Sequence, residues 1–350
     1  MKPASQNDVE RLPGYSIPRG TRDTQVKDDF RPAWWLPGPH AQTLWGKLFR
    51  REPLQPTDVE RWSTPDEDFI DIHRLKAPPA AARLLLLHGL EGTIRSQYAQ
   101  GLLGEARMRR WAADMLIFRS CGGELNRTRR FYHSGETGDL TFVIDRIVRE
   151  HPNQPLCLVG VSLGGNVLLK YLGEKGPHVP AQIKAAVAVS VPFDLGLSSR
   201  YIDHGFTRLY QRRFIRSLKR KALEKLQRFP DLIERERLAD LRTMYEFDDA
   251  LTAPVHGFRD ADDYYSSSSS LRWIEHISIP TLLLSAADDP FLPKSVLEDV
   301  HSVARRNPLL ELEFPTHGGH AGFVGGRNPF RPIYYAERRA CDFLAKHTPR

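Results

Sequence analysis

Short apolar runs and longer amphipathic stretches alternate along most of this chain. The apolar runs predict strands that are buried on both faces, as in the middle of a parallel sheet, and the amphipathic stretches predict helices that cover it. Strands are expected at residues 59–62, 69–74, 84–87, 115–118, 156–161, 185–191, 281–285 and 310–314. Helices are expected at residues 98–110, 137–150, 166–172 and 333–344. This alternation indicates an α/β fold with a mostly parallel central sheet flanked by helices.

Three segments depart from the alternation. Residues 1–30 are polar and rich in turn-forming residues, which predicts an N-terminal arm without the apolar core of a signal peptide. Residues 31–56 are aromatic and irregular and are expected to wrap over the core. Residues 195–275 are charged and helix-like, and we expect them to form a helical cap inserted into the domain at 31–350. The serine run at 266–270 is interpreted as packed, because aromatic residues flank it; a flexible linker is the alternative.

Composition excludes several classes of protein. Of the 350 residues, 41% are apolar, and no apolar run approaches the about 18 residues of a membrane span. The three cysteines are too few and too scattered for a disulfide framework, which fits a reducing compartment and a cytoplasmic location. The net charge of +7 comes without a helix-turn-helix, zinc or RNA-binding motif, so no nucleic-acid partner is expected. No feature of the sequence specifies an oligomeric state.

Much of the positive charge lies in residues 208–221, where Lys and Arg are interleaved with Leu209, Phe214, Ile215 and Leu218. This pattern predicts an amphipathic helix with a solvated basic face, which we expect on the outer side of the cap. A second interpretation is a basic element that makes weak contact with an anionic membrane surface or binds an anionic substrate.

The most specific chemical signal is the run Gly160-Val161-Ser162-Leu163-Gly164 between an expected strand and an expected helix. Strand, G-x-S-x-G and helix form the nucleophile elbow of α/β-hydrolases, in which a strained turn exposes the serine Oγ. Glycine is needed on both sides because side chains there would collide with the neighbouring strand and helix. The free N–H groups at the start of the helix favour developing negative charge. Ser162 is therefore the predicted nucleophile.

A nucleophilic serine needs a base and an acid that orients the base, and in this fold they follow the serine in the order acid, then histidine. Asp288 and Asp289 follow the seventh expected strand, at the sheet edge where such proteins place their sites. Asp289 is preferred because it has the D-x-x-x-P spacing to Pro293, and Asp288 is the alternative. The predicted base is His320, on a glycine-rich loop after the last strand, and His317 is its competitor.

Two backbone N–H groups are expected to form an oxyanion hole for the tetrahedral intermediate. One belongs to Leu163, directly after the nucleophile. The other belongs to Leu90, which follows a His-Gly pair at the end of the third expected strand. His317 and His320 stand three residues apart, but no acidic residue is at ligand spacing, so neither a metal nor another cofactor is expected.

Beyond these motifs, the chain resembles the YheT-like α/β-hydrolases, a group that includes membrane-anchored lipases of mammals and ethyl ester synthases of yeast. The similar stretches, within about residues 30–330, are 39–44, 88–92, 119–126, 132–135 with Asp139, 160–164, 191–195, 246–249, 263–265, 288–290 and 318–323. The resemblance implies the α/β-hydrolase fold and a Ser-Asp-His hydrolase of acyl esters, in agreement with the residues chosen from position. The membrane-anchored relatives carry an N-terminal hydrophobic helix that this sequence lacks, so it is more similar to the bacterial branch.

The sequence thus predicts a serine carboxylesterase or lipase-like hydrolase that cleaves a small acyl ester through an acyl-enzyme intermediate. An alcohol acyltransferase with the same triad is the second hypothesis. A non-catalytic protein that binds lipid or a membrane surface on a hydrolase scaffold is the third. The three triad residue types argue for an enzyme, because function is decided by the site and not by the fold.

Overall fold

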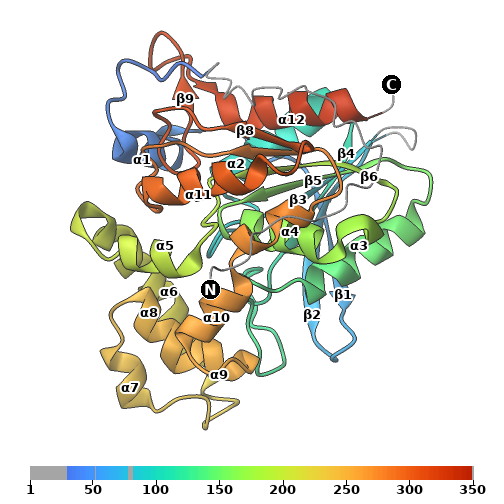
Figure 1. The fold of residues 1–350 in the computed structure, drawn as a ribbon. Helices are drawn as coiled ribbons and strands as arrows, with labels where there is room; N and C mark the ends of the chain where they lie inside the picture. The colour runs from blue at the N-terminus through green and yellow to red at the C-terminus, as the bar shows by residue number, and fades with distance from the viewer. Residues whose placement is uncertain (1–29, 52, 78–81, 349–350) are drawn as a thin grey trace, which may run out of the picture.

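The computed structural model describes residues 30–51, 53–77 and 82–348, and its centre is an eight-stranded sheet with the order β1-β2-β4-β3-β5-β6-β7-β8 (Figure 1). The strands are β1 (Asp58–Ser63), β2 (Phe69–Leu75), β3 (Arg83–Leu87), β4 (Ala112–Ile117), β5 (Leu156–Val161), β6 (Ile183–Val189), β7 (Thr281–Leu284) and β8 (Leu310–Glu313). β1 and β2 pair antiparallel with their neighbours, and the other six strands run parallel. The mostly parallel sheet predicted from the alternation is confirmed.

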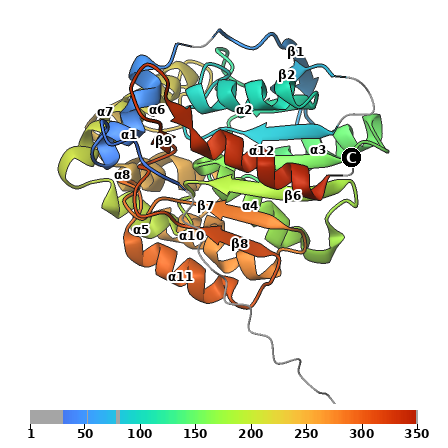
Figure 2. The same cartoon turned by 90° about the horizontal axis from the view of Figure 1, so that it is seen from above.

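Helices cover both faces of the sheet (Figure 2). α2 (Gln97–Met108) and α12 (Tyr335–His347) contact each other on one face, and α3 (Gly138–Glu150) and α4 (Leu163–Lys175) contact each other on the other. Every residue of β3, β4 and β5 is buried, because helices lie on both sides of these strands. Parallel pairing of β3, β5, β6 and β7 brings the carboxyl ends of these strands to one edge of the sheet.

Some elements differ from the sequence prediction. Residues 31–56 are not irregular throughout, because they contain the helix α1 (Pro39–Phe49). Its fully buried residues are Gln42 and Gly46, and its apolar residues Ala41 and Trp45 are only partly buried. The helix α11 (Lys294–Ala304) was not expected. The last helix begins at Tyr335, because the two residues before it pair as β10 (Ile333–Tyr334) with β9 (Val324–Gly325).

The predicted N-terminal arm, residues 1–30, lies outside the described residues except for its last member. Phe30 is buried, and its ring lies 5.7 Å from that of Phe323 and 5.1 Å from that of Tyr335. This contact attaches the start of the described chain to the segments that follow β8.

Residues between β6 and β7 form a set of helices below the sheet in Figure 1. They are α5 (Leu195–Tyr201), α6 (Arg208–Lys225), α7 (Arg235–Asp240), α8 (Met244–Phe247), α9 (Ala253–His256) and α10 (Ala261–Ser268), with a π-helical turn at Asp248–Thr252. A separate apolar cluster that includes Ile215, Leu238 and Leu251 supports them. The serine run ends α10 with Ser268 and Ser270 buried, which rules out the flexible linker as its interpretation.

Candidate active site

Ser162 lies at the turn from β5 into α4, and its backbone is in a rare conformation with φ 54° and ψ −122°. A serine in this region is strained and persists only where its surroundings enforce it. A Cβ on Gly160 would lie 2.4 Å from the Gly164 carbonyl oxygen, and one on Gly164 would lie 2.5 Å from that of His88. The two glycines of the motif are therefore required by the close approach of strand, helix and the loop after β3.

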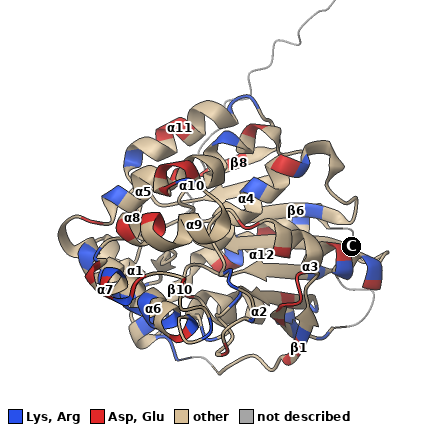
Figure 3. Cartoon of the chain, turned by 90° about the horizontal axis from the view of Figure 1, so that it is seen from below, with Lys and Arg blue, Asp and Glu red and all other residues tan. Residues whose placement is uncertain are grey.

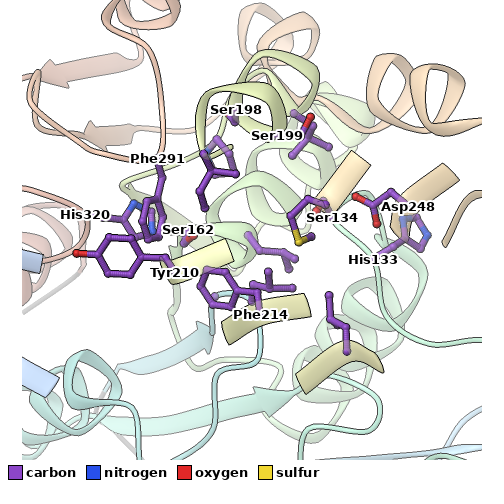
Figure 4. A pocket seen from close by; sticks show the side chains of 18 of the residues that line it. His133, Ser134, Ser162, Ser198, Ser199, Tyr210, Phe214, Asp248, Phe291 and His320 are labelled. Atoms are coloured by element: carbon purple, nitrogen blue, oxygen red, sulfur yellow. Dashed lines mark hydrogen bonds between the residues drawn. The ribbon is translucent and has the colours of Figure 1, made fainter. Parts of the chain in front are cut away.

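His320 and Asp289 form a hydrogen-bonded chain with Ser162. The Nε2 of His320 lies 3.0 Å from Ser162 Oγ, and its Nδ1 lies 2.9 Å and 3.1 Å from the two Asp289 carboxylate oxygens. The Asp289 side chain is fully buried, whereas 11% of the His320 side chain is exposed. The ring of Phe291 lies 4.1 Å from the imidazole and covers it on one side (Figure 4).

The loop that carries His320 is fixed by side chains from distant elements. The His320 N–H donates to the Thr43 hydroxyl of α1 at 2.9 Å, and the Ala321 N–H donates to the Ser190 hydroxyl after β6, also at 2.9 Å. These two hydrogen bonds hold the backbone at His320 and Ala321 and thereby position the imidazole. Neither partner was predictable from the sequence, because each belongs to a segment far along the chain.

The alternative acid and base pair with each other, apart from Ser162. Asp288 Oδ2 lies 3.1 Å from the Nδ1 of His317, whose side chain is exposed. The other oxygen of Asp288 accepts a hydrogen bond from the Gly319 N–H at 2.9 Å. Asp288 thus supports the glycine-rich loop, whereas His320 contacts Ser162 directly and Asp289 contacts His320.

Leu90 and Leu163 line the same cavity as Ser162. Within the described ranges, no protein acceptor takes a hydrogen bond from the N–H of either residue. Gly89, just before Leu90, packs so closely that a Cβ there would lie 3.1 Å from Ser162 Cβ. An oxyanion hole needs two such backbone donors.

His88 is a structural histidine beneath this loop. Its Nε2 accepts a hydrogen bond from the Phe118 N–H at 3.0 Å. Its Nδ1 therefore carries the ring proton and donates a hydrogen bond to the Gly89 carbonyl oxygen at 2.7 Å. Complete burial lowers the pKa of His88 to about 4. The neutral ring therefore fixes the backbone just before Leu90.

Glu91, the next residue of the loop, connects it to the helical insert. Its backbone is in the left-handed region with φ 56°, and its Oε1 lies 2.6 Å from Lys221 Nζ on α6. The Tyr132 hydroxyl donates to the same oxygen and accepts from the Glu91 N–H, each at 2.8 Å. Sequence reasoning missed this contact and placed Lys221 on a solvated face. No signal in the sequence marks it, because Glu91 and Lys221 are 130 residues apart and the basic pattern of the helix does not distinguish one lysine from another.

The basic stretch is helical as predicted, but it does not lie wholly on the outer face. Lys225, four residues beyond the stretch at the last position of α6, is buried and donates to Asn126 Oδ1 at 2.8 Å. Lys219 donates to the carbonyl oxygens of Ala239 and Leu241. The three lysines of α6 that follow Leu218 thus bind protein groups, because their long side chains reach acceptors beside the helix. The exposed basic residues of α6 are Arg208, Arg212, Arg213, Arg216 and Arg220 (Figure 3).

A cavity of about 290 Å³ lies between the sheet edge and the helical insert. Figure 4 shows Ser162 and His320 at one end of it and Asp248 and His133 at the other. Its walls are mostly apolar, with Leu195, Ile202, Phe214, Leu218, Met244, Phe247 and Leu251 among the lining residues. An apolar cavity with a few polar groups is typical of a small-molecule site.

Comparison with known proteins identifies the family. A family model described as alpha/beta hydrolase fold matches residues 82–326. YheT of Escherichia coli (strain K12) is 39% identical over 324 residues, which cover 91% of this chain and 94% of YheT. A monoacylglycerol lipase of Saccharomyces cerevisiae is 31% identical over 78% of this chain, which spans 61% of the lipase. The phospholipase ABHD3 of Bos taurus is 28% identical, with 88% of this chain and 76% of the phospholipase covered.

Solved structures agree on the fold. An esterase of Pyrococcus furiosus superposes with a TM-score of 0.53 at 14% identity, over 84% of this chain and 94% of the esterase. The chain therefore belongs to the α/β-hydrolase family, and within it to the YheT-like group. By this membership it is an enzyme of the carboxylic ester hydrolase class. Among the described residues, no helix is both long and apolar enough to cross a membrane.

Proposed function

We propose that this protein hydrolyses acyl esters through a covalent acyl-enzyme on Ser162, with His320 as general base and acid and Asp289 as the group that orients His320. The observation that carries the proposal is the continuous chain from Ser162 Oγ to His320 Nε2 at 3.0 Å and from His320 Nδ1 to Asp289 at 2.9 Å. This chain ends in a mostly apolar cavity, which can take up an ester beside the serine.

In the first step, Ser162 Oγ attacks the ester carbonyl carbon while His320 Nε2 takes the hydroxyl proton. The carbonyl oxygen becomes an oxyanion, and the N–H groups of Leu90 and Leu163 donate to it. Asp289 stays ionised and accepts the Nδ1–H bond, which stabilises the imidazolium. When the tetrahedral intermediate collapses, the proton on Nε2 passes to the leaving alcohol, and Ser162 keeps the acyl group.

In the second half of the reaction, His320 removes a proton from water, and the resulting hydroxide attacks the acyl carbon. The second tetrahedral intermediate uses the same two N–H donors. Collapse releases the carboxylic acid and returns the proton to Ser162 Oγ. Because an alcohol in place of water would give transfer instead of hydrolysis, the choice between the two depends on which nucleophile enters the cavity.

The proposed substrates are esters with an aliphatic acyl chain. Support comes from the apolar walls of the cavity and from relatives named as a monoacylglycerol lipase and a phospholipase. Helices α5 to α10 act as a cap in this proposal: they close the cavity over Ser162 and lower the local dielectric, which strengthens the oxyanion contacts.

We also propose weak contact between the cavity entrance and an anionic membrane surface. α1 and α6 meet at this entrance, where the ring of His40 lies 4.5 Å from that of Phe206, just before α6. Lys47 and Arg213, both exposed, line the cavity on this side. The two helices therefore form the rim through which a lipid-like ester enters.

The rim combines apolar and cationic side chains. Leu48 of α1 and Leu209 of α6 are 60% and 52% exposed. Arg208, Arg212 and Arg216 are exposed on the same helix as Leu209 (Figure 3). Apolar side chains among arginines are the composition that favours binding to a surface of anionic lipid.

The hydrolase proposal is tested by labelling and turnover. The wild-type protein should react with a fluorophosphonate probe and cleave a series of p-nitrophenyl esters of increasing chain length. Ser162→Ala should lose the labelling and nearly all turnover, whereas Ser302→Ala, an exposed serine on α11, should keep both. Product analysis with added ethanol distinguishes hydrolysis from transfer. Labelling that persists in Ser162→Ala would contradict the assignment.

A further inference from the structure

The end of the cavity opposite Ser162 carries a buried carboxylate (Figure 4). Asp248 is 7% exposed, and its two oxygens accept hydrogen bonds from the Tyr265 hydroxyl at 2.7 Å and the Thr252 hydroxyl at 2.6 Å. Burial raises the pKa of Asp248 to about 6. Between the described side chains there is no ion pair that joins Asp248 to Lys, Arg or His.

This carboxylate can accept more hydrogen bonds than the protein supplies. An ionised carboxyl group accepts about four hydrogen bonds, and the hydroxyls of Thr252 and Tyr265 supply two of them. The nearby histidines add no charge, because burial lowers the pKa of His133 and of His256 and keeps both rings neutral near pH 7. A buried charge without a cation is costly, so its retention calls for an explanation.

The backbone at Asp248 is unusual as well. Helix α8 passes into α9 through the π-helical turn Asp248–Thr252. Such turns are rare and frequently occur at functional sites. Here the turn begins with the carboxylate and ends with one of its two hydroxyl partners, Thr252, so it determines where the carboxylate stands on the cavity wall.

Three stretches that carry the resemblance but take no part in the triad meet at this end, residues 132–135, 246–249 and 263–265. The Tyr264 hydroxyl accepts a hydrogen bond from the Ser134 N–H at 2.8 Å. Asn166 donates to the Ser134 carbonyl oxygen, also at 2.8 Å. Because Asn166 lies in α4, four residues after Ser162, the far end of the cavity is tied to the helix that begins at the nucleophile.

The acyl side of the ester belongs at this end. Lys47 and Arg213, which are exposed, mark the open side of the cavity, through which the alcohol must leave and water must enter. The acyl group stays bound to Ser162 between these events. The part of the cavity between Phe214 and Asp248 is therefore left for the acyl chain.

We propose that Asp248 forms a subsite for a hydrogen-bond donor, a hydroxyl or an ammonium group, at the distal end of the substrate's acyl chain. This inference rests on the proposed ester hydrolysis and names the chemical class of its substrate. A plain alkyl end would leave the carboxylate without further partners, whereas a donor group fills an open acceptor position. A site built to bind a donor discriminates strongly against the analogue that lacks it.

The test compares matched p-nitrophenyl esters from butanoate to dodecanoate, each with a methyl, hydroxyl or ammonium end. In the wild-type protein, kcat/KM for the hydroxyl or the ammonium series should exceed that for the alkyl series by roughly tenfold or more at one chain length. The series that shows the gain identifies the donor. Asp248→Leu should remove the preference, whereas Asp249→Asn, which alters a carboxylate bonded to the Ala261 N–H, should keep it.

The acetate ester is the internal control, because its acyl group is too short to reach Asp248. Asp248→Leu should still cleave it and should still be labelled by a fluorophosphonate. Equal loss on acetate and on the long esters would assign Asp248 a structural role and overturn the proposal. A wild-type protein that cleaves esters but prefers alkyl ends at every length would overturn it whether or not the variants fold.

Failure of ester hydrolysis itself has a different signature, because no ester, acetate included, would then be cleaved. Calorimetric titration of the wild-type protein with decanoate, 10-hydroxydecanoate and 10-aminodecanoate repeats the comparison without turnover. Tighter binding of one of the two substituted acids supports the subsite, and equal or weaker binding of both overturns it.

Discussion

Glu91 and Lys221 join the loop that carries Leu90 to helix α6 through an ion pair of 2.6 Å. Both side chains are about nine-tenths buried, with 10% and 11% exposed. The pair therefore couples two parts of the molecule that have separate tasks in the proposed mechanism: the loop that supplies an N–H to the oxyanion and the helix that covers the cavity. Tyr132, bonded twice to Glu91, holds the same loop from the body of the protein.

The first prediction concerns this pair. Lys221→Met should lower the free energy of unfolding by about 3 kcal/mol or more, because it leaves the buried Glu91 carboxylate without its cation. It should also lower kcat for a short-chain ester more than it raises KM, because the Leu90 N–H loses its fixed position. Urea unfolding and steady-state kinetics measure the two effects. Arg220→Met, which changes the exposed neighbour, is the control and should change neither value.

The second prediction separates the two adjacent aspartates. Asp289→Asn should reduce kcat by roughly 10⁴-fold, because an amide favours the wrong tautomer of His320 and does not stabilise the imidazolium. Asp288→Asn should keep most of the activity, because Asp288 contacts the exposed His317 and the Gly319 N–H instead. The ratio of the two kcat values is the measurement. Similar losses in both variants would mean that the acid has been assigned wrongly.

The sequence predicted the sheet and the residues at its edge because both depend on local rules. Buried parallel strands leave continuous apolar runs, as β5 does, and the elbow at Ser162 leaves its two glycines. Asp289 and His320 follow strands whose carboxyl ends meet at one edge, so their positions along the chain were enough to bring them together.

Contacts that depend on the insert were not predictable in this way. The ion pair of Glu91 joins a loop after β3 to a helix more than a hundred residues later, and a basic helix pattern gives no indication of which lysine is buried. The same holds for Asp248, whose partner Tyr265 lies on another helix and whose π-helical turn has no sequence signature. Helix α1 was missed because prolines surround its start and its fully buried positions, Gln42 and Gly46, are not large apolar residues.

The third prediction tests the proposed rim. The wild-type protein should bind vesicles that contain phosphatidylserine more tightly than vesicles of phosphatidylcholine alone, with the larger difference at low salt. The double variant Arg212→Ser/Arg216→Ser should remove most of that difference. Leu209→Ser should weaken binding to both kinds of vesicle, because burial of an exposed leucine is favourable on any lipid surface.

Cosedimentation measures binding of each protein to the two kinds of vesicle. Arg305→Ser and Arg306→Ser, at the end of α11, serve as controls of equal charge. Equal binding of the wild-type protein to the two vesicles would refute the electrostatic part.

The last prediction concerns acid and the buried ring of His88. Its Nε2 must be unprotonated to accept the Phe118 N–H, and burial lowers its pKa from 6.5 to about 4. In the unfolded chain the ring takes up its proton at a higher pH than in the folded protein. The stability that the neutral ring contributes is therefore complete above about pH 6.5 and is lost as the pH falls through about 4.

The free energy of unfolding of the wild-type protein should decrease over this interval by more than that of His88→Asn, which has no titrating ring at this position. His204→Asn, at an exposed histidine in the insert, should follow the wild-type curve. Parallel curves for the wild-type protein and His88→Asn would mean that the ring is not the group whose protonation destabilises the fold.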